Sequence, residues 1–444
     1  MAMDTIVAAA TPPGFGGVAI VRVSGPEAER IARRILGRLP EPRTATHGTF
    51  QSADGRKLDT GLALYFPAPA SYTGESVLEL HGHGGPVVVS LLVDTAVELG
   101  ARLAEPGEFT RRAFLNDKLD LAQAEAIADL ISSSTAQAAR AALRSLTGAF
   151  STAVEELAKK LLRLRMYVEA AIDFPEEEVD FLSDDELLTH LNQCDGSFCE
   201  LMSQAKIGRV LRDGYRVVIV GKPNVGKSSL LNRLSGEDAA IVTEVAGTTR
   251  DVLREQINID GLAVELVDTA GLRDNPDRIE EEGIRRAREA LKSADAVLWI
   301  QDATESGDTA IGEDVPEGAE VTVVRNKVDL TKQPPGATPD DPTVINLSAK
   351  TGKGIDALHD RLRDLAGYKN LGEGAFTARQ RHIDALHRAA GHFRTGRKAL
   401  EQVRAGELLA EELRLAQQAL GEVTGEVSSD DLLGRIFADF CIGK

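Results

Sequence analysis

The chain has 444 residues, room for roughly two to four domains, and its hydrophobic fraction of 43% permits buried cores. A formal net charge of −18 disfavours non-specific binding of nucleic acid, and an aromatic fraction of 4% makes stacking platforms scarce, so contact with RNA requires a local basic patch or a partner. The three cysteines make no disulfide framework, and the absence of a basic leader or a long apolar run favours a cytoplasmic protein without a membrane segment.

The first piece, to about Asn116, alternates short apolar runs with glycine and proline and predicts an α+β domain. His81 and His83 stand among clustered glycines, and because acidic or cysteine ligands at metal spacing do not accompany them, we interpret them as part of a turn. The expected strands are Thr5–Ala10, Val18–Val23, Leu62–Phe66 and Val77–Leu80, and the expected helices are Glu27–Leu36 and Val87–Leu99.

A helical pattern begins at Leu119 and continues to about Leu211, broken by an acidic turn at Asp173–Glu178. An α/β pattern occupies about Gly214–Leu365, and helical periodicity resumes at about Arg379. Helices on both sides of an α/β segment indicate one helical domain interrupted by an insertion, which a surface loop with close ends tolerates well.

A phosphate-binding loop is predicted at Gly221–Ser228, between the apolar strand Arg216–Val220 and the helix-like run Ser229–Leu234. Glycines let the backbone wrap around phosphates, Lys227 reaches the β- and γ-phosphates, and the Ser228 hydroxyl binds Mg²⁺. The residues expected to contact the phosphates are Asn224, Val225, Gly226, Lys227, Ser228 and Ser229.

Two further motifs supply the other residues expected near the phosphates and the Mg²⁺ ion. Asp268–Gly271 follows the apolar strand Val264–Val267, so that Asp268 can hold the metal through water and the Gly271 N–H can contact the γ-phosphate. Thr249 lies where a switch loop belongs and is the second Mg²⁺ candidate. The remaining GTP contacts expected here are Thr243, Thr248, Thr269 and Ala270.

Two later motifs, each of which follows an apolar strand, are expected to recognise the base of the nucleotide. In Asn326-Lys327-Val328-Asp329, the Asp329 carboxylate can accept hydrogen bonds from N1 and N2 of guanine, donors that adenine does not offer in that arrangement. Ser348, Ala349 and Lys350 then place a backbone N–H near guanine O6. The order of these motifs, each after a strand, predicts a GTP-binding domain.

The hydrolytic step is less clear from the residues. Leu272 stands where Ras-like GTPases carry a water-orienting glutamine, so either hydrolysis is poor or another group replaces it. The Asn224 amide oxygen could hold a monovalent cation against the phosphates, with carbonyls of Thr243–Thr248. Asn224 could equally serve only to shape the loop.

Motifs along the whole chain resemble the tRNA-modification GTPase family MnmE, also called TrmE. They are Ala10–Gly14, His81–Pro86, Pro106–Phe109, Ala113–Leu121 and the terminal Phe440–Lys444. The resemblance implies a multidomain fold, with an α+β folate-binding domain, a discontinuous all-α helical domain and an inserted α/β Ras-like P-loop GTPase domain. The implied boundaries are 1–117 for folate binding and dimerisation, 118–213 and 368–444 for the two helical parts, and 214–367 for the GTPase.

By matching positions, the resemblance implies that Arg22, Glu79, Lys118 and Lys444 contact 5-formyl- or 5,10-methylene-tetrahydrofolate. A carboxylate suits the paired donors of a pterin edge, although the residues alone favour an ordinary surface pair for Arg22 and Glu79. Cys441 is expected to act in the folate pocket or in the chemistry.

The resemblance also implies K⁺ as the cation, held by Asn224, Thr243, Val245 and Thr248, and Glu280 as the catalytic residue that orients water. Glu281 and Glu282, the next two residues, are the alternatives for this role. It further implies a homodimer that forms a heterotetramer with the flavoprotein MnmG (GidA) and modifies C5 of the wobble uridine of tRNA.

Two alternatives remain. A ribosome-assembly GTPase shares the nucleotide motifs but generally carries a basic appendage that this acidic chain lacks. A stand-alone folate-dependent aminomethyltransferase would use GTP only as a regulator.

Overall fold

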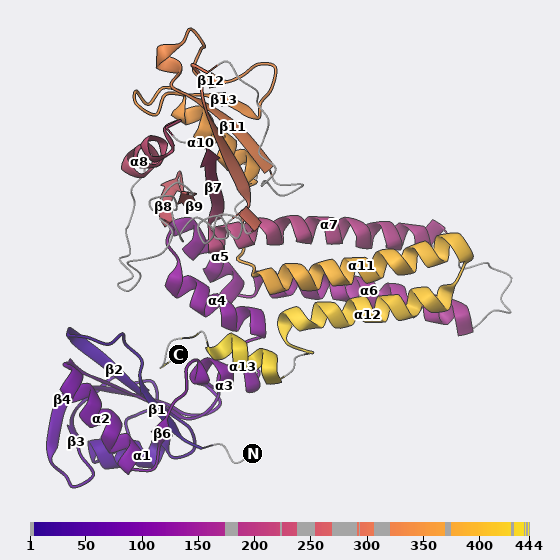
Figure 1. Cartoon of the computed structure of the whole chain (residues 1–444). Coiled ribbons are helices and arrows are strands. Elements are labelled where there is room, and N and C mark those ends of the chain that lie inside the picture. The colour runs from indigo at the N-terminus through magenta and orange to yellow at the C-terminus, as the bar shows by residue number, and fades with distance from the viewer. Residues whose placement is uncertain are drawn as a thin grey trace, which may run out of the picture. The chain divides into compact units, whose positions relative to one another are not determined.

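The computed structural model describes residues 4–173, 185–222, 224–237, 254–268, 291–292, 294–305, 320–368, 374–427, 430–438, 440 and 443. They belong to two compact units, Met1–Ala128 with Glu411–Lys444, and Asp129–Ala410 (Figure 1). None of the helices in the described ranges has both the length and the apolar character that crossing a bilayer requires.

The first unit is built on a six-stranded sheet in the order β3-β4-β5-β2-β1-β6, antiparallel except where β1 meets β6. The strands are β1 (Ile6–Ala9), β2 (Gly16–Ser24), β3 (Thr46–Gln51), β4 (Lys57–Phe66), β5 (Val77–Gly84) and β6 (Arg102–Leu103). β3 and β6 were not among the predicted strands, because β3 reads Thr-His-Gly-Thr-Phe-Gln, with one large apolar residue, and β6 has two residues.

One face of this sheet packs on the helices α1 (Ala28–Leu36) and α2 (Pro86–Glu98). Alternation along β5 buries Leu78 and Leu80 in that core and turns Glu79 and His81 to the opposite face. The prediction of a turn at His81 and His83 is therefore wrong, since both lie within β5.

A short helix, α3 (Glu108–Leu115), and the helix α13 (Asp430–Ala438) also belong to the first unit. α3 was not predicted. It begins after Gly107, which has φ 65°, and a Cβ there would lie 2.6 Å from the Phe437 carbonyl oxygen. The cluster of Leu121, Phe437 and Phe440 thus brings the end of the chain against α3 and the start of the next helix.

The second unit contains long helices whose apolar residues recur at helical spacing, as in the buried stripe of Leu157, Leu161, Leu164 and Val168. Phe198 and Phe393 pack with ring centroids 5.4 Å apart, and Figure 1 shows the helices α6, α7 and α11 running side by side. The helices are α4 (Leu121–Ser132), α5 (Ala136–Leu146), α6 (Ala149–Asp173), α7 (Asp185–Asp213), α11 (Gln380–Val403) and α12 (Gly406–Thr424). Two of them are shared with the first unit, to which residues 121–128 of α4 and residues 411–424 of α12 belong. The acidic turn predicted at 173–178 lies, after residue 173, outside the described residues.

Buried Asp129, on α4, joins the two points at which the chain enters and leaves the α/β segment. Its Oδ1 accepts hydrogen bonds from Nε of Arg212 at 2.8 Å and from Nη2 of Arg379 at 2.7 Å. Arg212 is near the end of α7, and Arg379 caps the start of α11. The insertion predicted from the pattern therefore has both of its ends fixed on one carboxylate.

The α/β segment forms a seven-stranded sheet in the order β12-β13-β11-β10-β7-β9-β8, parallel except at its two edge strands. The strands are β7 (Tyr215–Gly221), β8 (Arg254–Ile259), β9 (Leu262–Asp268), β10 (Ala296–Asp302), β11 (Glu320–Asn326), β12 (Gly336–Ala337) and β13 (Val344–Asn346), with the helices α8 (Lys227–Glu237) and α10 (Ile355–Leu365). Parallel strands end at one edge, so the motif-bearing loops gather there, as binding sites of open α/β sheets do.

Candidate functional site

The phosphate loop connects β7 to α8, as predicted. A Cβ at Gly221 would lie 2.5 Å from the Ile300 carbonyl oxygen, and one at Gly226, where φ is 96°, would lie 2.3 Å from Nδ2 of Asn326. Both positions therefore require glycine. Asn224 has φ 63°, a left-handed conformation that asparagine tolerates better than most residues.

Lys227 begins α8 and is buried, with Nζ donating hydrogen bonds to the carbonyl oxygens of Gly221 at 2.9 Å and Lys222 at 2.8 Å. The ammonium group thus lies against the loop that is predicted to hold the phosphates. Ser228 and Ser229 are exposed in the first turn of α8, next to its positive end. This geometry suits a triphosphate with its metal ion.

Asn326 joins the phosphate loop to the base-reading loop. Its Nδ2 donates to the Val225 carbonyl oxygen at 2.9 Å, and its Oδ1 accepts from the Ala349 N–H at 2.9 Å. Asn326 is buried, so both bonds form away from water. Ser348 Oγ donates a hydrogen bond to Asp329 Oδ1 at 2.5 Å. Asp329 is exposed, so its carboxylate is accessible to a nucleotide base.

Lys327 links the same loops by charge. Its Nζ donates to the Asn224 carbonyl oxygen at 2.8 Å and to Asp302 Oδ2 at 2.7 Å. The hydrogen bonds from Lys327 and Thr304 lower the pKa of Asp302 to about 2, so this carboxylate is ionised at neutral pH. The backbone of Asn224 is thereby held from the base side of the site.

A second cluster lies on the sheet of the first unit. Arg22 and Glu79 face each other on β2 and β5, and Arg22 Nε donates to Glu79 Oε1 at 2.8 Å. Arg22 Cζ also lies 5.5 Å from the centroid of the Tyr72 ring. Arg22 Nη1 donates to the Gly443 carbonyl oxygen at 3.3 Å, so the end of the chain reaches this pair.

Gly443 has φ 94°, and a Cβ there would lie 2.1 Å from the Ala9 carbonyl oxygen. The penultimate residue can lie this close to β1 only because it is glycine. Lys118 Nζ, which is exposed, donates to the Pro69 carbonyl oxygen at 3.2 Å. Lys118 therefore lies against the loop that carries Tyr72.

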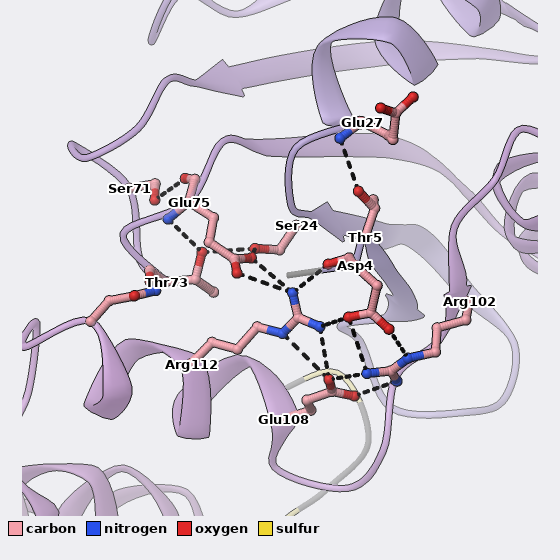
Figure 2. Close-up of polar contacts among 11 residues, drawn as sticks. Asp4, Thr5, Ser24, Glu27, Ser71, Thr73, Glu75, Arg102, Glu108 and Arg112 are labelled. Atoms are coloured by element: carbon pink, nitrogen blue, oxygen red, sulfur yellow. Dashed lines mark hydrogen bonds and ion pairs between the residues drawn. The ribbon is translucent and has the colours of Figure 1, made fainter. Parts of the chain in front are cut away.

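An ion network supports that loop (Figure 2). Arg112 Nη1 donates to the Glu75 carboxylate at 3.0 and 3.1 Å, and Nη2 donates to Glu108 at 2.9 Å and to Asp4 at 2.7 Å. Arg102 bonds both Glu108 and Asp4. Hydrogen bonds from Arg102 and Arg112 lower the pKa of Asp4. Burial opposes ionisation of Glu108, but the two arginines and the Glu105 N–H still lower its pKa.

Comparisons with known proteins identify the family of the chain. A family model described as the MnmE helical domain matches residues 121–441, and one described as the GTP-binding protein TrmE N-terminus matches residues 5–118. The chain is 56% identical over 450 residues to the tRNA modification GTPase MnmE of Erwinia tasmaniensis, covering 99% of each. It is 54% identical over 453 residues to that of Vibrio cholerae serotype O1, covering 100% of each.

The chain belongs to the MnmE family. The resemblance read from the sequence and the multidomain fold class are confirmed. Among solved structures, a GTP-binding protein from Sulfolobus solfataricus in complex with GDP is 22% identical, with a TM-score of 0.27 over 48% of this chain and 67% of that one.

Several residues expected from the nucleotide motifs or from the MnmE resemblance fall where the structure gives no side chain. Asp268 ends β9, where its backbone is paired with Ile219. Outside the described residues lie Thr243, Val245, Thr248, Thr249, Thr269, Ala270, Gly271, Glu280, Cys441 and Lys444. The described part of the site thus joins the phosphate loop to the base loop, and the metal and catalytic assignments stay predictions.

The sequence interpretation also missed neighbours of Arg22. Phe109 is fully buried, with its ring centroid 5.7 Å from Arg22 Cζ, and Tyr72 shares a hydrogen bond with Thr110 through its hydroxyl at 2.8 Å. His81 Nε2 lies 3.3 Å from Glu79 Oε2. Of these, only His81 could have been predicted from the sequence, because residues two apart on a strand lie on the same face and His81 follows Glu79 by two.

Proposed function

We propose that this MnmE-family GTP hydrolase drives addition of an aminomethyl or carboxymethylaminomethyl group to C5 of the wobble uridine (U34) of certain tRNAs. The observation that carries the nucleotide part is the Asn326 side chain, which bonds Val225 and Ala349 and so unites the phosphate loop with the base loop. The tRNA part rests on full-length similarity to curated tRNA modification GTPases.

In the proposed reaction, Lys227 exchanges its bonds with the loop carbonyls for oxygens of the β- and γ-phosphates. Asp329 accepts the two guanine donors, and Ser348, which donates to it, fixes its orientation. Ser228 and Thr249 would hold Mg²⁺, which when bound neutralises charge on the triphosphate. The exposed Ser228 hydroxyl beside Lys227 fits that role.

We assign the K⁺ site to Asn224, Thr243, Val245 and Thr248. The Asn224 carbonyl already accepts from Lys327, so its exposed side-chain amide is the group available to an ion. When bound, K⁺ supplies positive charge beside the phosphates, as an arginine finger does in other GTPases. Glu280 would orient the attacking water.

The folate site is proposed at Arg22, Glu79, Lys118 and Lys444, with 5-formyl- or 5,10-methylene-tetrahydrofolate as ligand. The Arg22–Glu79 pair fits such a ligand, because a carboxylate can accept paired N–H donors and cations attract a glutamate tail. Cys441 would act in the same pocket or in the chemistry.

The remaining assignments concern the assembly. We propose a cytoplasmic homodimer joined through residues 1–117, with the GTPase domain at 214–367 inserted between helical parts 118–213 and 368–444. The partner would be the flavoprotein MnmG (GidA) in a heterotetramer. Nucleotide hydrolysis would shift the dimer between open and closed arrangements rather than form the carbon bond.

The test measures U34 modification by the full chain with MnmG, tRNA, GTP and a folate donor. Lys227→Ala should abolish both GTP hydrolysis and modification, because the phosphates lose their cation. Lys222→Ala is the matched control and should leave both activities unchanged. It removes an exposed lysine side chain from the same loop but keeps the backbone carbonyl that contacts Lys227. Full modification by the Lys227→Ala protein would refute the role of GTP.

A further inference from the structure

The face of β5 turned away from α1 and α2 presents Glu79, His81 and His83 in a row. The side chains of Glu79 and His81 are mostly covered, with exposed fractions of 15% and 23%, while that of His83 is 70% exposed. Two of the three therefore lie in a partly enclosed environment beside Arg22, and the third faces solvent.

The two oxygens of the Glu79 carboxylate have different partners. Arg22 Nε donates to Oε1 at 2.8 Å, and His81 Nε2 lies within hydrogen-bond distance of Oε2, at 3.3 Å. Since a carboxylate oxygen accepts two hydrogen bonds, each oxygen keeps an acceptor position. The carboxylate is thus held from both sides and can still receive donors from a ligand.

The surroundings of His81 leave Glu79 as its polar partner. Across the sheet, His81 is opposite Ile20 on β2 and Leu62 on β4, both apolar. Within the described residues, Glu79 is the only side chain that hydrogen-bonds the His81 ring. His83, two residues along the strand, bonds instead to Asp59 through Nδ1 at 2.7 Å.

We propose that His81 is a positioning residue of the folate site, which fixes the plane of the Glu79 carboxylate for a ligand with paired N–H donors, the edge of an aminopyrimidinone ring. The assignment rests on the proposed folate site. Without His81, Arg22 alone restrains the carboxylate, which can then rotate out of the plane that paired acceptance requires.

The experiment is isothermal titration of the full chain with 5-formyltetrahydrofolate. His81→Leu should raise the Kd about tenfold, because the carboxylate loses one charge-assisted hydrogen bond. His81→Gln should stay within about threefold of the parent, since the glutamine amide supplies an N–H donor at similar reach. His83→Leu, the matched control on the same strand, should bind as the parent does.

A double-substitution cycle separates positioning from general damage to the strand. In a Glu79→Gln background, His81→Leu should add little further loss, because its effect acts through Glu79. Equal losses in both backgrounds, or unchanged binding by His81→Leu, would overturn the assignment while leaving the folate site intact. Absence of binding by the unsubstituted chain would overturn the folate site, and this role with it.

Discussion

Asp329 is the residue on which base selection depends in the proposed site. Its carboxylate is exposed and oriented by Ser348 Oγ, so an Asp329→Asn substitution preserves shape but replaces one acceptor with a donor. We expect GTP to bind about 100-fold more weakly, because two charge-assisted hydrogen bonds to guanine are disrupted. Xanthosine triphosphate, whose C2 oxygen accepts a hydrogen bond, should gain affinity.

The measurement is nucleotide affinity for both triphosphates by competition. Asp340→Asn, an exposed substitution in the same domain, is the control and should change neither affinity. Unaltered GTP binding by the Asp329 variant would show that another group reads the base.

In the proposed K⁺ site, Asn224 supplies the side-chain oxygen that binds the ion. Its backbone is already fixed by Lys327, so Asn224→Ala removes the amide oxygen and leaves that carbonyl contact possible. We expect the parent to turn over GTP faster in K⁺ than in Na⁺ by about tenfold or more, and the variant to lose that difference. Equal turnover in both salts by the parent would contradict the cation assignment.

Single residues also show how far the sequence could be interpreted. The glycines and Lys227 were predictable, because a wrapped backbone and a phosphate cation dictate those residue types at that spacing. The bond from Asn326 to Val225 was not, because 101 positions separate the two and only the parallel sheet brings them together. Nor could the sequence show why position 443 must be glycine, because the reason is the close approach of the Ala9 backbone.

At the scale of elements, the network around Arg112 ties α3 to the Tyr72 loop and to the start of the chain. The pKa values of Asp4 and Glu108 are lowered from ordinary values of 3.8 and 4.5. The folded state thus holds fewer protons than the unfolded state around pH 4. These ion pairs therefore contribute fully above about pH 5, and their contribution is lost as the pH falls through the lowered values.

We accordingly expect Arg112→Met to lower the thermal unfolding temperature by about 10 °C at pH 7, since buried Glu75 loses its cation and buried Glu108 keeps only Arg102. At pH 4 the loss should be smaller, because carboxyls that have lost Arg112 are partly protonated at that pH and a neutral carboxyl needs no cation. Arg56→Met, which removes only an exposed pair with Asp54, is the control. Calorimetric scans that show the same shift at both pH values would contradict this account.

Elements with strong periodicity were predictable, and those without it were not. The phosphate loop lies between β7 and α8, as the apolar run before it and the helical run after it indicated. By contrast, α3 starts at a glycine held by Phe437, which lies more than 300 positions later, so local pattern could not reveal it. Likewise, Gly82 and Gly84 are typical of a turn when only the local sequence is considered. In the structure, β5 continues through both of them, because they pair with residues of β2.

At the scale of the whole molecule, the question is whether one protomer hydrolyses GTP alone. Leu272 occupies the place of the water-orienting glutamine, so we propose that two GTPase domains of the homodimer meet to complete the site. If they do, a protomer paired with one that cannot hold the triphosphate should hydrolyse poorly. The Lys227→Ala chain, which lacks the phosphate cation, provides such a partner.

We therefore expect co-expression with excess Lys227→Ala chain to lower GTP turnover per unsubstituted chain several-fold, since most unsubstituted chains would then lie in mixed dimers. Distinct affinity tags allow mixed dimers to be purified and their turnover measured in K⁺. Mixed dimers made with Lys222→Ala chain should hydrolyse at the parental rate, because Lys222 is exposed and only its backbone carbonyl contacts Lys227. Undiminished turnover by the unsubstituted chain beside an inactive partner would mean that each protomer contains all the groups its hydrolysis needs.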